Sequence, residues 1–134
     1  RQKTPLSVMC FDLDGFKSIN DTYGHPGGDA VLREVLTSIR TNVRESDLIC
    51  RWGGDEFVVI FPETGRQDAM IKARELADNI REAPVRFGRD QILITISAGV
   101  TEYRDGEDLE TLMARVDNAL YTAKASGRDH ISLA

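Results

Sequence analysis

The chain has 134 residues, enough for one domain with a hydrophobic core of its own. Hydrophobic residues make up 41% of it and charged residues 29%, a balance that excludes a disordered segment. The net charge of −5 excludes a basic surface for a nucleic-acid backbone, so we expect no nucleic-acid partner.

The first predicted elements are a strand and two helices. The apolar run at residues 6–13 predicts a strand that is buried on both faces and ends at the carboxylates Asp12 and Asp14. A short helix is expected next, ending at Gly24. It is followed by a long amphipathic helix, whose apolar stripe is formed by Val31, Leu32, Val35, Leu36, Ile39 and Val43.

The middle of the chain predicts a hairpin and a third helix. Residues 47–52 and 57–61 are short β-type runs, and Gly53 and Gly54 between them are a strong hairpin signal. Apolar residues at helical spacing then predict a helix over residues 70–80.

The last third of the chain predicts two strands on either side of a helix. Residues 91–100 alternate as a strand does, residues 109–123 predict a helix stopped by Gly127, and residues 131–133 predict a final strand. We also expect a small hairpin around Gly88.

The predicted element order is β-α-α-β-β-α-β-α-β, which contains a βαββαβ unit. This order is typical of an α+β fold of the ferredoxin-like or palm type, in which helices cover one face of an antiparallel central sheet. We expect residues 1–134 to form a single domain.

Membrane and export signals are missing from the sequence. No apolar run approaches the roughly 18 residues that cross a bilayer, and no signal peptide opens the chain. We therefore expect a cytoplasmic, soluble domain without membrane contact, or the cytoplasmic part of a membrane-bound sensor.

Cys10 and Cys50 lie inside apolar runs, which favours reduced thiols packed in the core. Trp52 and Phe57 are likewise expected in the core or in a site wall.

Acidic residues come at two predicted strand ends. Asp12 and Asp14 close the first strand, and Asp55 and Glu56 follow the glycine pair between two others. If these strands are neighbours in the sheet, Asp12 and Asp55 converge, and such carboxylates together with substrate phosphates suit Mg²⁺. The alternative is a solvated strand end and the acidic tip of an ordinary two-residue hairpin.

Four stretches together form a more specific pattern than any of them alone. They are Phe11–His25 with Gly28 and Asp29 (FDLDGFKSINDTYGH and GD), Arg51–Phe57 (RWGGDEF), Ser97–Val100 (SAGV) and Tyr121–Arg128 (YTAKASGR). In this order and spacing, over essentially the whole chain, they resemble the GGDEF family, the diguanylate cyclases. The resemblance implies an enzyme that condenses two GTP molecules into the second messenger cyclic di-GMP and releases pyrophosphate. Two domains would meet as a catalytic homodimer, each holding one GTP.

The resemblance also implies the residues that carry out the reaction. Asp12, Asp55 and the backbone carbonyl of Leu13 would hold Mg²⁺, with Mn²⁺ as the alternative ion. Asp55 would also be the general base for the 3′-hydroxyl, and Glu56 belongs to the same catalytic group. Lys17 would stabilise charge on the phosphates during transfer, although alone it reads as a solvated surface lysine.

Further positions of the resemblance would bind the nucleotide. They are Asn20 and Asp29 for guanine, His25 beside the base or ribose, Gly53 and Gly54 for close approach of the ligand, and Lys124 and Arg128, one helical turn apart, for the terminal phosphates. Structural alternatives exist for several of them: a helix C-cap for Asn20, a helix N-cap for Asp29, and cations complementing a helix dipole for the last two.

Arg44 and Asp47 form an RxxD pattern shortly before the glycine pair. In the family that the chain resembles, this pair grips the product, which implies cyclic di-GMP as an inhibitor. A further arginine for that site has two candidates on the next helix, Arg74 and Arg81. The alternative is an i,i+3 salt bridge at a helix end.

The chain departs from the family pattern at its start. Family members usually begin earlier, with a helix and an Asp-x-Leu-Thr motif, so we expect a GGDEF domain without that segment and an upstream sensor domain in the full-length protein. The alternative function is a catalytically silent module that binds cyclic di-GMP or GTP, and a third is a relative of palm-type cyclases or polymerases. Asp55 and Glu56 are both present, which favours the enzyme.

Overall fold

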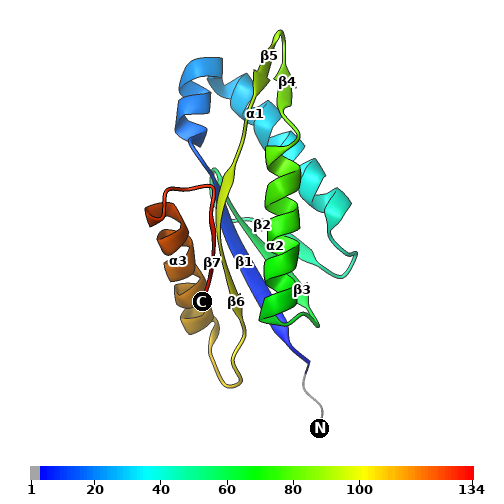
Figure 1. Ribbon diagram of the computed structural model, residues 1–134, viewed down its shortest axis with the longest axis vertical. Coiled ribbons are helices and arrows are strands. Elements are labelled where there is room, and N and C mark those ends of the chain that lie inside the picture. Colours follow the sequence, from blue (N-terminus) through cyan, green and yellow to red (C-terminus); the bar gives the residue numbers. More distant parts are fainter. Residues whose placement is uncertain (1–3) are drawn as a thin grey trace.

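The computed structural model describes residues 4–134 of the chain. Within these residues, three helices pack on a five-stranded sheet, and a small two-stranded sheet extends from one end (Figure 1). The elements are β1 (Leu6–Leu13), α1 (Phe16–Asn42), β2 (Leu48–Arg51), β3 (Glu56–Pro62), α2 (Arg66–Arg81), β4 (Val85–Phe87), β5 (Asp90–Ile92), β6 (Ile96–Glu102), α3 (Leu109–Ala125) and β7 (Ile131–Leu133). The predicted α+β class is confirmed.

The large sheet has the strand order β2-β3-β1-β6-β7. β1 is central and runs antiparallel to both β3 and β6, as expected. β7, however, pairs parallel to β6, so the sheet is mixed and not purely antiparallel. The reason is that α3 joins β6 to β7 as a crossover helix, which returns the chain in the same direction.

Helices cover both faces of the sheet, and the prediction that they cover one face is wrong. Met9, Phe11 and Leu13 of β1 belong to the core under α1 and α2. Val8 and Cys10 point the other way and pack with α3. This alternation confirms that the first strand is buried on both faces, because successive side chains of a strand point to opposite sides.

α1 contains the break predicted at Gly24. This residue has φ 74° and ψ 175°, so two helical segments meet there at a kink. Pro26 follows at once in the second segment, where its missing N–H costs nothing in a first helical turn. The predicted stripe is confirmed, since Val31, Leu32, Val35 and Ile39 are buried.

The strand predicted over residues 91–100 is divided in two. β5 pairs with β4 in a hairpin around Gly88, which has φ 61°, as expected. Leu93 is 72% exposed, and the Thr95 carbonyl accepts a hydrogen bond from the Asp14 N–H at 2.9 Å. The segment between β5 and β6 therefore bonds to the turn after β1 and leaves the ladder.

The cysteine prediction holds for Cys10, which is buried, and is wrong for Cys50, which is exposed. Cys50 lies on the edge strand β2, whereas α3 packs on β1, β6 and β7. Trp52, next to the same edge, is 65% exposed, while Phe57 is buried and stacks on Phe11 with ring centroids 5.1 Å apart. Both thiols are free.

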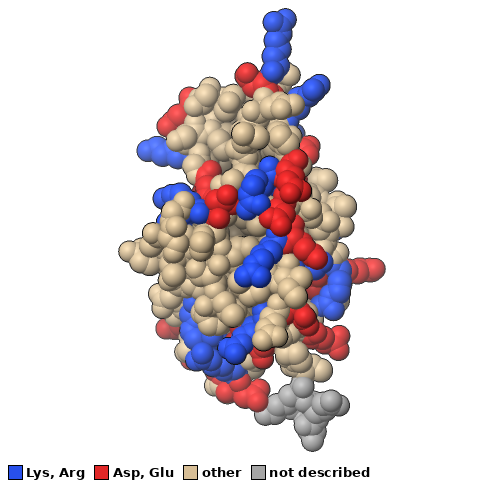
Figure 2. Space-filling model, in the orientation of Figure 1, with Lys and Arg blue, Asp and Glu red and all other residues tan. Residues whose placement is uncertain are grey.

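Charged groups of both signs are interspersed over the face of the molecule seen in Figure 2. That face carries no broad basic patch, in line with the net charge of −5. Among residues 4–134, no helix combines the length and apolarity that crossing a bilayer requires.

Candidate active site

Two carboxylates lie side by side on the face of the sheet that α3 covers. Asp12 of β1 is paired in register with Glu56, the first residue of β3. Asp55 precedes Glu56 directly, and its carbonyl oxygen accepts a hydrogen bond from the Leu13 N–H at 3.2 Å. The two acidic strand ends are therefore neighbours, which was the condition for their convergence.

Asp12 is almost completely buried, with 7% of its surface exposed. Its Oδ2 pairs with the ammonium group of Lys124, which α3 brings across the sheet. Its Oδ1 is buried and has no hydrogen-bond partner among the described residues. A buried acceptor without a partner is uncommon and indicates a place for a cation or an ordered donor.

The carboxylates of this cluster repel one another, and, after burial, this repulsion contributes to the raised pKa values of Asp12 and Glu56. Burial raises the pKa of Asp12, and Asp55 and Asp14 add to the increase while Lys124 opposes it. Burial likewise raises the pKa of Glu56, and the charges on Asp12 and Asp55 push it further in the same direction. A cation placed among these groups would relieve the repulsion.

The same carboxylates also affect the pKa of the buried Cys10 thiol. Burial first, and then the charges of Asp117, Asp12 and Glu56, raise its pKa to about 12. The folded state therefore favours the protonated form of this thiol. This agrees with its assignment to the core.

The donor set fits a hard divalent cation, with the substrate completing the coordination shell. No group of three or more His, Cys, Asp or Glu side chains in residues 4–134 is arranged to hold a metal ion by itself. Mg²⁺ needs only one or two protein carboxylates when phosphate oxygens and water supply the rest. The free Oδ1 of Asp12, with Asp55 adjacent, matches that requirement.

The glycine turn between β2 and β3 is wider than a two-residue hairpin. The Trp52 N–H donates to the Glu56 carbonyl at 2.8 Å, and the Arg51 guanidinium donates to the carbonyls of Gly53 and Gly54. Neither glycine has a positive φ, so a left-handed conformation does not explain them. A Cβ at Gly54 would meet nothing within 4 Å, which leaves the backbone open to a ligand.

Four predicted site residues lie on α1, which leaves the end of β1 through the turn at Asp14. Lys17 is exposed in the first helical turn, and His25 and Asp29 are exposed near the kink. Asn20 packs against Gly28, where an added Cβ would come within 1.9 Å of its Oδ1. Asn20 and Asp29 both lie inside helical segments, because the break falls at Gly24, so the cap alternatives for them are wrong.

Lys124 and Arg128 do not share a helix face, contrary to the prediction. α3 ends at Ala125, and Arg128 lies beyond it with φ 64°. Gly127, with φ 107°, is where the chain turns away, so the predicted stop is confirmed. The loop after α3 nevertheless returns to the end of β1, since the Asp129 N–H donates to Asp14 Oδ2 at 2.9 Å.

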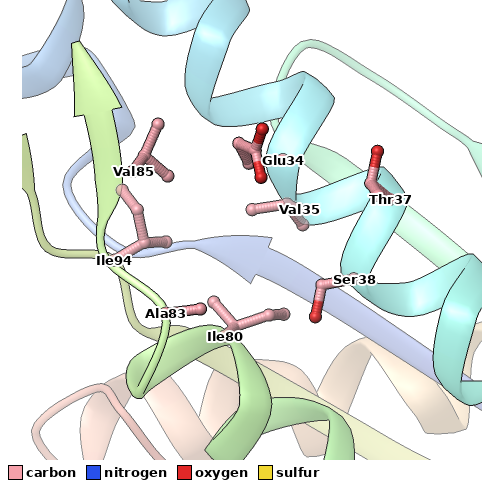
Figure 3. A pocket seen from close by; sticks show the side chains of 8 residues that line it. All are labelled: Glu34, Val35, Thr37, Ser38, Ile80, Ala83, Val85 and Ile94. Carbon is pink, nitrogen blue, oxygen red and sulfur yellow. The ribbon is translucent and has the colours of Figure 1, made fainter.

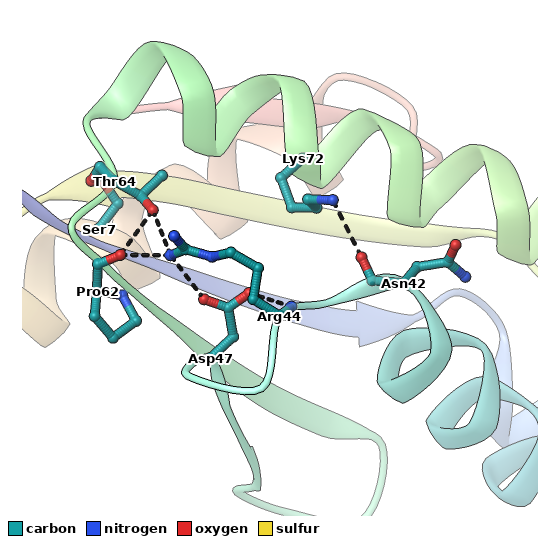
Figure 4. A network of polar contacts seen from close by, with 7 residues as sticks. All are labelled: Ser7, Asn42, Arg44, Asp47, Pro62, Thr64 and Lys72. Atoms are coloured by element: carbon teal, nitrogen blue, oxygen red, sulfur yellow. Dashed lines mark hydrogen bonds and ion pairs between the residues drawn. The ribbon is translucent and has the colours of Figure 1, made fainter.

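Arg44 and Asp47 hold the turn between α1 and β2 (Figure 4). The Arg44 Nη2 donates to Asp47 Oδ1 at 3.1 Å, to the Pro62 carbonyl at 2.5 Å and to Thr64 Oγ1 at 2.9 Å. Asp47 is buried, whereas 49% of the Arg44 side chain is exposed. The i,i+3 salt bridge is thus present, and about half of the Arg44 side chain remains exposed.

Of the two candidates for a further arginine, Arg81 has partners in the structure. Its guanidinium donates to Asp78 on the same helix and to both oxygens of Asp129. These bonds raise the pKa of Arg81. Arg74 is exposed and lines a hollow of about 240 Å³ with Arg81, Asp129 and His130.

Sequence reasoning missed the hydrogen bonds of Asp14 and the position of Asp117 near Cys10 and Glu56. The Asp14 carboxylate accepts hydrogen bonds from Thr95 and Ser97, residues about eighty positions away, and no local signal announces such a contact. Asp117 was detectable in principle, because it lies two helical turns before Lys124 and so shares its side of α3.

A cavity of about 110 Å³ between α1, α2 and β4 contains none of the predicted site residues (Figure 3). Its apolar lining comes from Val35, Ile80, Ala83, Val85 and Ile94, with Glu34, Thr37 and Ser38 at its edge. Its largely apolar lining distinguishes it from the acidic cluster around Asp12.

Comparison with known proteins identifies the family. Residues 1–130 match the family model described as diguanylate cyclase, GGDEF domain. The chain belongs to the GGDEF family. The response regulator PleD of Caulobacter vibrioides is 45% identical over 130 residues, which are 95% of this chain and 29% of PleD. Diguanylate cyclase A of Treponema denticola is 39% identical over 133 residues, 98% of this chain and 36% of that protein.

Solved GGDEF structures superpose closely on this fold. The diguanylate cyclase SiaD of Pseudomonas aeruginosa, in complex with its activator SiaC, gives a TM-score of 0.94 at 41% identity, covering 98% of this chain and 50% of that one. The GGDEF domain of DgcB from Caulobacter crescentus, in complex with c-di-GMP, gives 0.92 at 31% identity, covering 97% and 76%. The GGDEF chain spans 29% to 36% of the length of the curated relatives named above.

Proposed function

We propose that this GGDEF domain is a diguanylate cyclase that condenses two GTP molecules into cyclic di-GMP and releases pyrophosphate. The observation that carries the proposal is the buried Asp12 beside Glu56 and Asp55, inside an unbroken RWGGDEF sequence. Relatives of this chain are named diguanylate cyclases, which supports the same activity.

Asp12, Asp55 and the carbonyl of Leu13 are the proposed ligands of Mg²⁺, or of Mn²⁺ in its place. When bound, the ion would neutralise phosphate charge and lower the pKa of the attacking 3′-hydroxyl. Lys124 balances part of the charge of Asp12 in the absence of a metal. The same ammonium group is proposed to contact the terminal phosphates when the nucleotide is bound.

The proton of the 3′-hydroxyl is assigned to the carboxylate pair at the start of β3. Asp55 is the proposed general base, and Glu56, whose pKa burial and its neighbours raise, is a stronger proton acceptor than a solvated carboxylate. Lys17, exposed at the start of α1, is proposed to face the phosphates and stabilise charge that develops in the transition state. Arg128 is proposed to contact the terminal phosphates.

Guanine is the proposed base because of Asn20 and Asp29. A carboxylate accepts from both N1–H and the 2-amino group of guanine, whereas adenine offers no such pair of donors. His25, exposed near the kink, is proposed to border the base or ribose. Gly53 and Gly54 are proposed to admit the nucleotide close to the backbone.

Catalysis is proposed to need two copies of the chain face to face, each presenting one GTP. The test measures cyclic di-GMP by mass spectrometry with GTP and Mg²⁺, for the chain alone and for the chain fused to a dimeric coiled coil. We expect product from the fusion, none from its Asp55→Asn variant, and normal product from a matched Asp68→Asn variant, which changes an exposed carboxylate on α2. A folded fusion that binds GTP and makes no cyclic di-GMP would refute the proposal.

A second candidate function is binding of cyclic di-GMP without turnover. It is favoured by the half-exposed Arg44 beside Asp47, and by the relative DgcB, whose GGDEF domain was crystallised with c-di-GMP. In the cyclase this pair is proposed to act as a product-inhibition site. Calorimetry with cyclic di-GMP on wild type and Arg44→Ala, combined with the product assay, separates the two: a pure sensor binds without turnover and loses its ligand in the variant.

A further inference from the structure

The loop between α3 and β7 has an unusual backbone. Gly127, Arg128 and Asp129 follow one another with φ values of 107°, 64° and 47°. Two of the three are not glycine, and such residues adopt a left-handed conformation in only a minority of cases. The contacts of this loop with the rest of the fold show what holds it in place.

One of these contacts is the carboxylate of Asp14. Its Oδ2 accepts the backbone N–H of Asp129 at 2.9 Å and the hydroxyl of Thr95 at 2.7 Å, and its Oδ1 accepts the hydroxyl of Ser97 at 2.6 Å. Asp14 thus joins the end of β1, the segment before β6, β6 itself and the loop. A carboxylate with three short hydrogen bonds is fixed in one orientation.

A second contact comes from α2. The side chain of Asp129 accepts from Nη2 of Arg81 at 2.7 Å and from its Nε at 3.3 Å, and Arg81 is held in turn by Asp78. The next residue, His130, accepts a hydrogen bond at its carbonyl from the Ala98 N–H at 2.9 Å. Asp129 is therefore fixed at its backbone by Asp14 and at its side chain by Arg81.

The residue that this arrangement presents is Arg128. It lies between Gly127 and the doubly held Asp129, and its own side chain is exposed. The loop starts shortly after Lys124, which pairs with Asp12 on β1, and comes back to Asp14 in the turn directly after that strand. Arg128 therefore lies one residue before the amide that Asp14 holds at the end of β1.

We propose that Asp14 is a positioning residue, which anchors the 127–129 loop and thereby sets the guanidinium of Arg128 for the triphosphate of the nucleotide. This inference rests on the proposed function for its ligand. The proposal gives two neighbouring carboxylates different roles. Asp12 has a buried oxygen without a partner, which could bind a cation, whereas both oxygens of Asp14 accept hydrogen bonds from other parts of the fold.

The anchor is tested first without nucleotide, by hydrogen exchange at the Asp129 amide. Asp14→Ala removes the acceptor, and we expect that amide to exchange at least about tenfold faster, as the loss of a charge-assisted bond predicts. Asp14→Asn keeps one acceptor oxygen for the amide and can donate to Ser97, so it is expected to retain the protection. An Asp129 amide that stays equally protected in Asp14→Ala would overturn the anchor.

The positioning is tested by calorimetry with Mg²⁺ and a non-reactive GTP analogue, with GMP as the comparison ligand. We expect Asp14→Ala to weaken binding of the analogue about tenfold, to leave GMP binding unchanged, and to add nothing in an Arg128→Ala background. Thr95→Val, which removes a different bond to the same oxygen, is the matched control and is expected to bind normally. Equal losses for the analogue and GMP, or additive losses in the double variant, would overturn the proposal.

Asp14→Asn decides between positioning and metal binding. A positioning residue keeps its function as the amide, whereas a metal ligand loses it, so normal binding by Asp14→Asn and weak binding by Asp14→Ala support the proposal. Weak binding by both overturns it. If wild type itself binds no analogue, the proposed function fails, and the exchange experiment still decides whether Asp14 anchors the loop.

Discussion

At the scale of single residues, the position of Lys124 explains how a buried carboxylate is tolerated. Asp12 is 7% exposed, and removing a charge from water costs several kcal/mol unless a partner or a cation compensates. Lys124 supplies that partner for one oxygen only. A divalent cation bound at Asp12, as proposed above, would compete with this lysine for the charge of the same carboxylate.

Lys124→Met tests this competition through stability. We expect a loss of about 2 kcal/mol in the free energy of unfolding without metal, since Asp12 then lies buried without its counter-ion. We also expect Mg²⁺ to stabilise the variant more than wild type, because the ammonium group no longer competes. Urea unfolding with and without Mg²⁺ measures both effects.

Lys72→Met is the matched control for this experiment. Lys72 pairs with Glu75, whose side chain is 56% exposed, and donates to the Asn42 carbonyl at 3.1 Å; surface ion pairs of this kind contribute about 0–1 kcal/mol. The control is expected to lose no more than that and to respond to Mg²⁺ as wild type does. A Lys124→Met variant that is as stable as this control and indifferent to Mg²⁺ would contradict the competition.

Glu107 provides the clearest pH dependence in the chain. The Arg115 side chain bonds both of its carboxylate oxygens, at 2.7 and 2.8 Å, and lowers the pKa of Glu107 to about 2 from an ordinary 4.5. A lowered pKa means that the folded state favours the ionised form. The stability it gives is complete above pH 4.5 and is lost as the pH falls toward 2.

We therefore expect wild type to lose more stability between pH 5 and pH 3 than the Glu107→Gln variant does. Chemical unfolding at these two pH values measures the difference. Glu45→Gln, at an exposed position in the turn after α1, is the control and is expected to follow wild type. If the free energy of unfolding fell equally with pH in wild type and Glu107→Gln, the contact with Arg115 would contribute nothing to stability.

At the scale of elements, the packing of α3 depends on one glycine in β6. A Cβ at Gly99 would come within 2.5 Å of both the Leu120 nitrogen and the Val116 oxygen, which belong to the helix backbone. The backbone cannot rotate away as a side chain can. The helix therefore lies directly on the strand at this point, which keeps Lys124 within reach of Asp12.

Gly99→Ala is expected to push α3 from the sheet and to destabilise the fold by about 2 kcal/mol, as overpacking does. Gly54→Ala is the control, since an added Cβ there meets nothing within 4 Å and stability should change by less than about 0.5 kcal/mol. Thermal or urea unfolding compares the two. If Gly99→Ala were as stable as Gly54→Ala, α3 would be able to move away from the sheet without loss of folding free energy.

Periodicity predicted most elements, because each follows from its own residues. The stripe on α1, the strand at β1 and the break at Gly24 depend on local spacing and on local backbone preference. The errors occurred where a distant contact decides. β5 and β6 separate because Thr95 bonds to Asp14, and Cys50 is exposed because β2 lies at the sheet edge.

At the scale of the whole molecule, the central position of β1 creates the site. β3 on one side places Glu56 and Asp55 beside Asp12, and α3 crosses the same face with Lys124. The acidic residues of the site were recognisable from the sequence because Asp12 comes at the end of one predicted strand, and Asp55 and Glu56 follow a glycine pair at the start of another. Lys124 on α3 was named only through the family resemblance, and its ion pair with Asp12 was not predicted, since only the folded sheet brings residues 12 and 124 together.

The central claim is that Asp12 and Asp55 bind a divalent cation that carries the triphosphate of GTP. A crystal structure of the chain with Mn²⁺ and a non-reactive GTP analogue tests it most directly, because the ion is located by its anomalous signal. The account predicts Mn²⁺ bound by carboxylate oxygens of Asp12 and Asp55 and by phosphate oxygens, with Lys124 released from Asp12. A nucleotide bound without an ion at Asp12, with Lys124 still paired to that carboxylate, would contradict it.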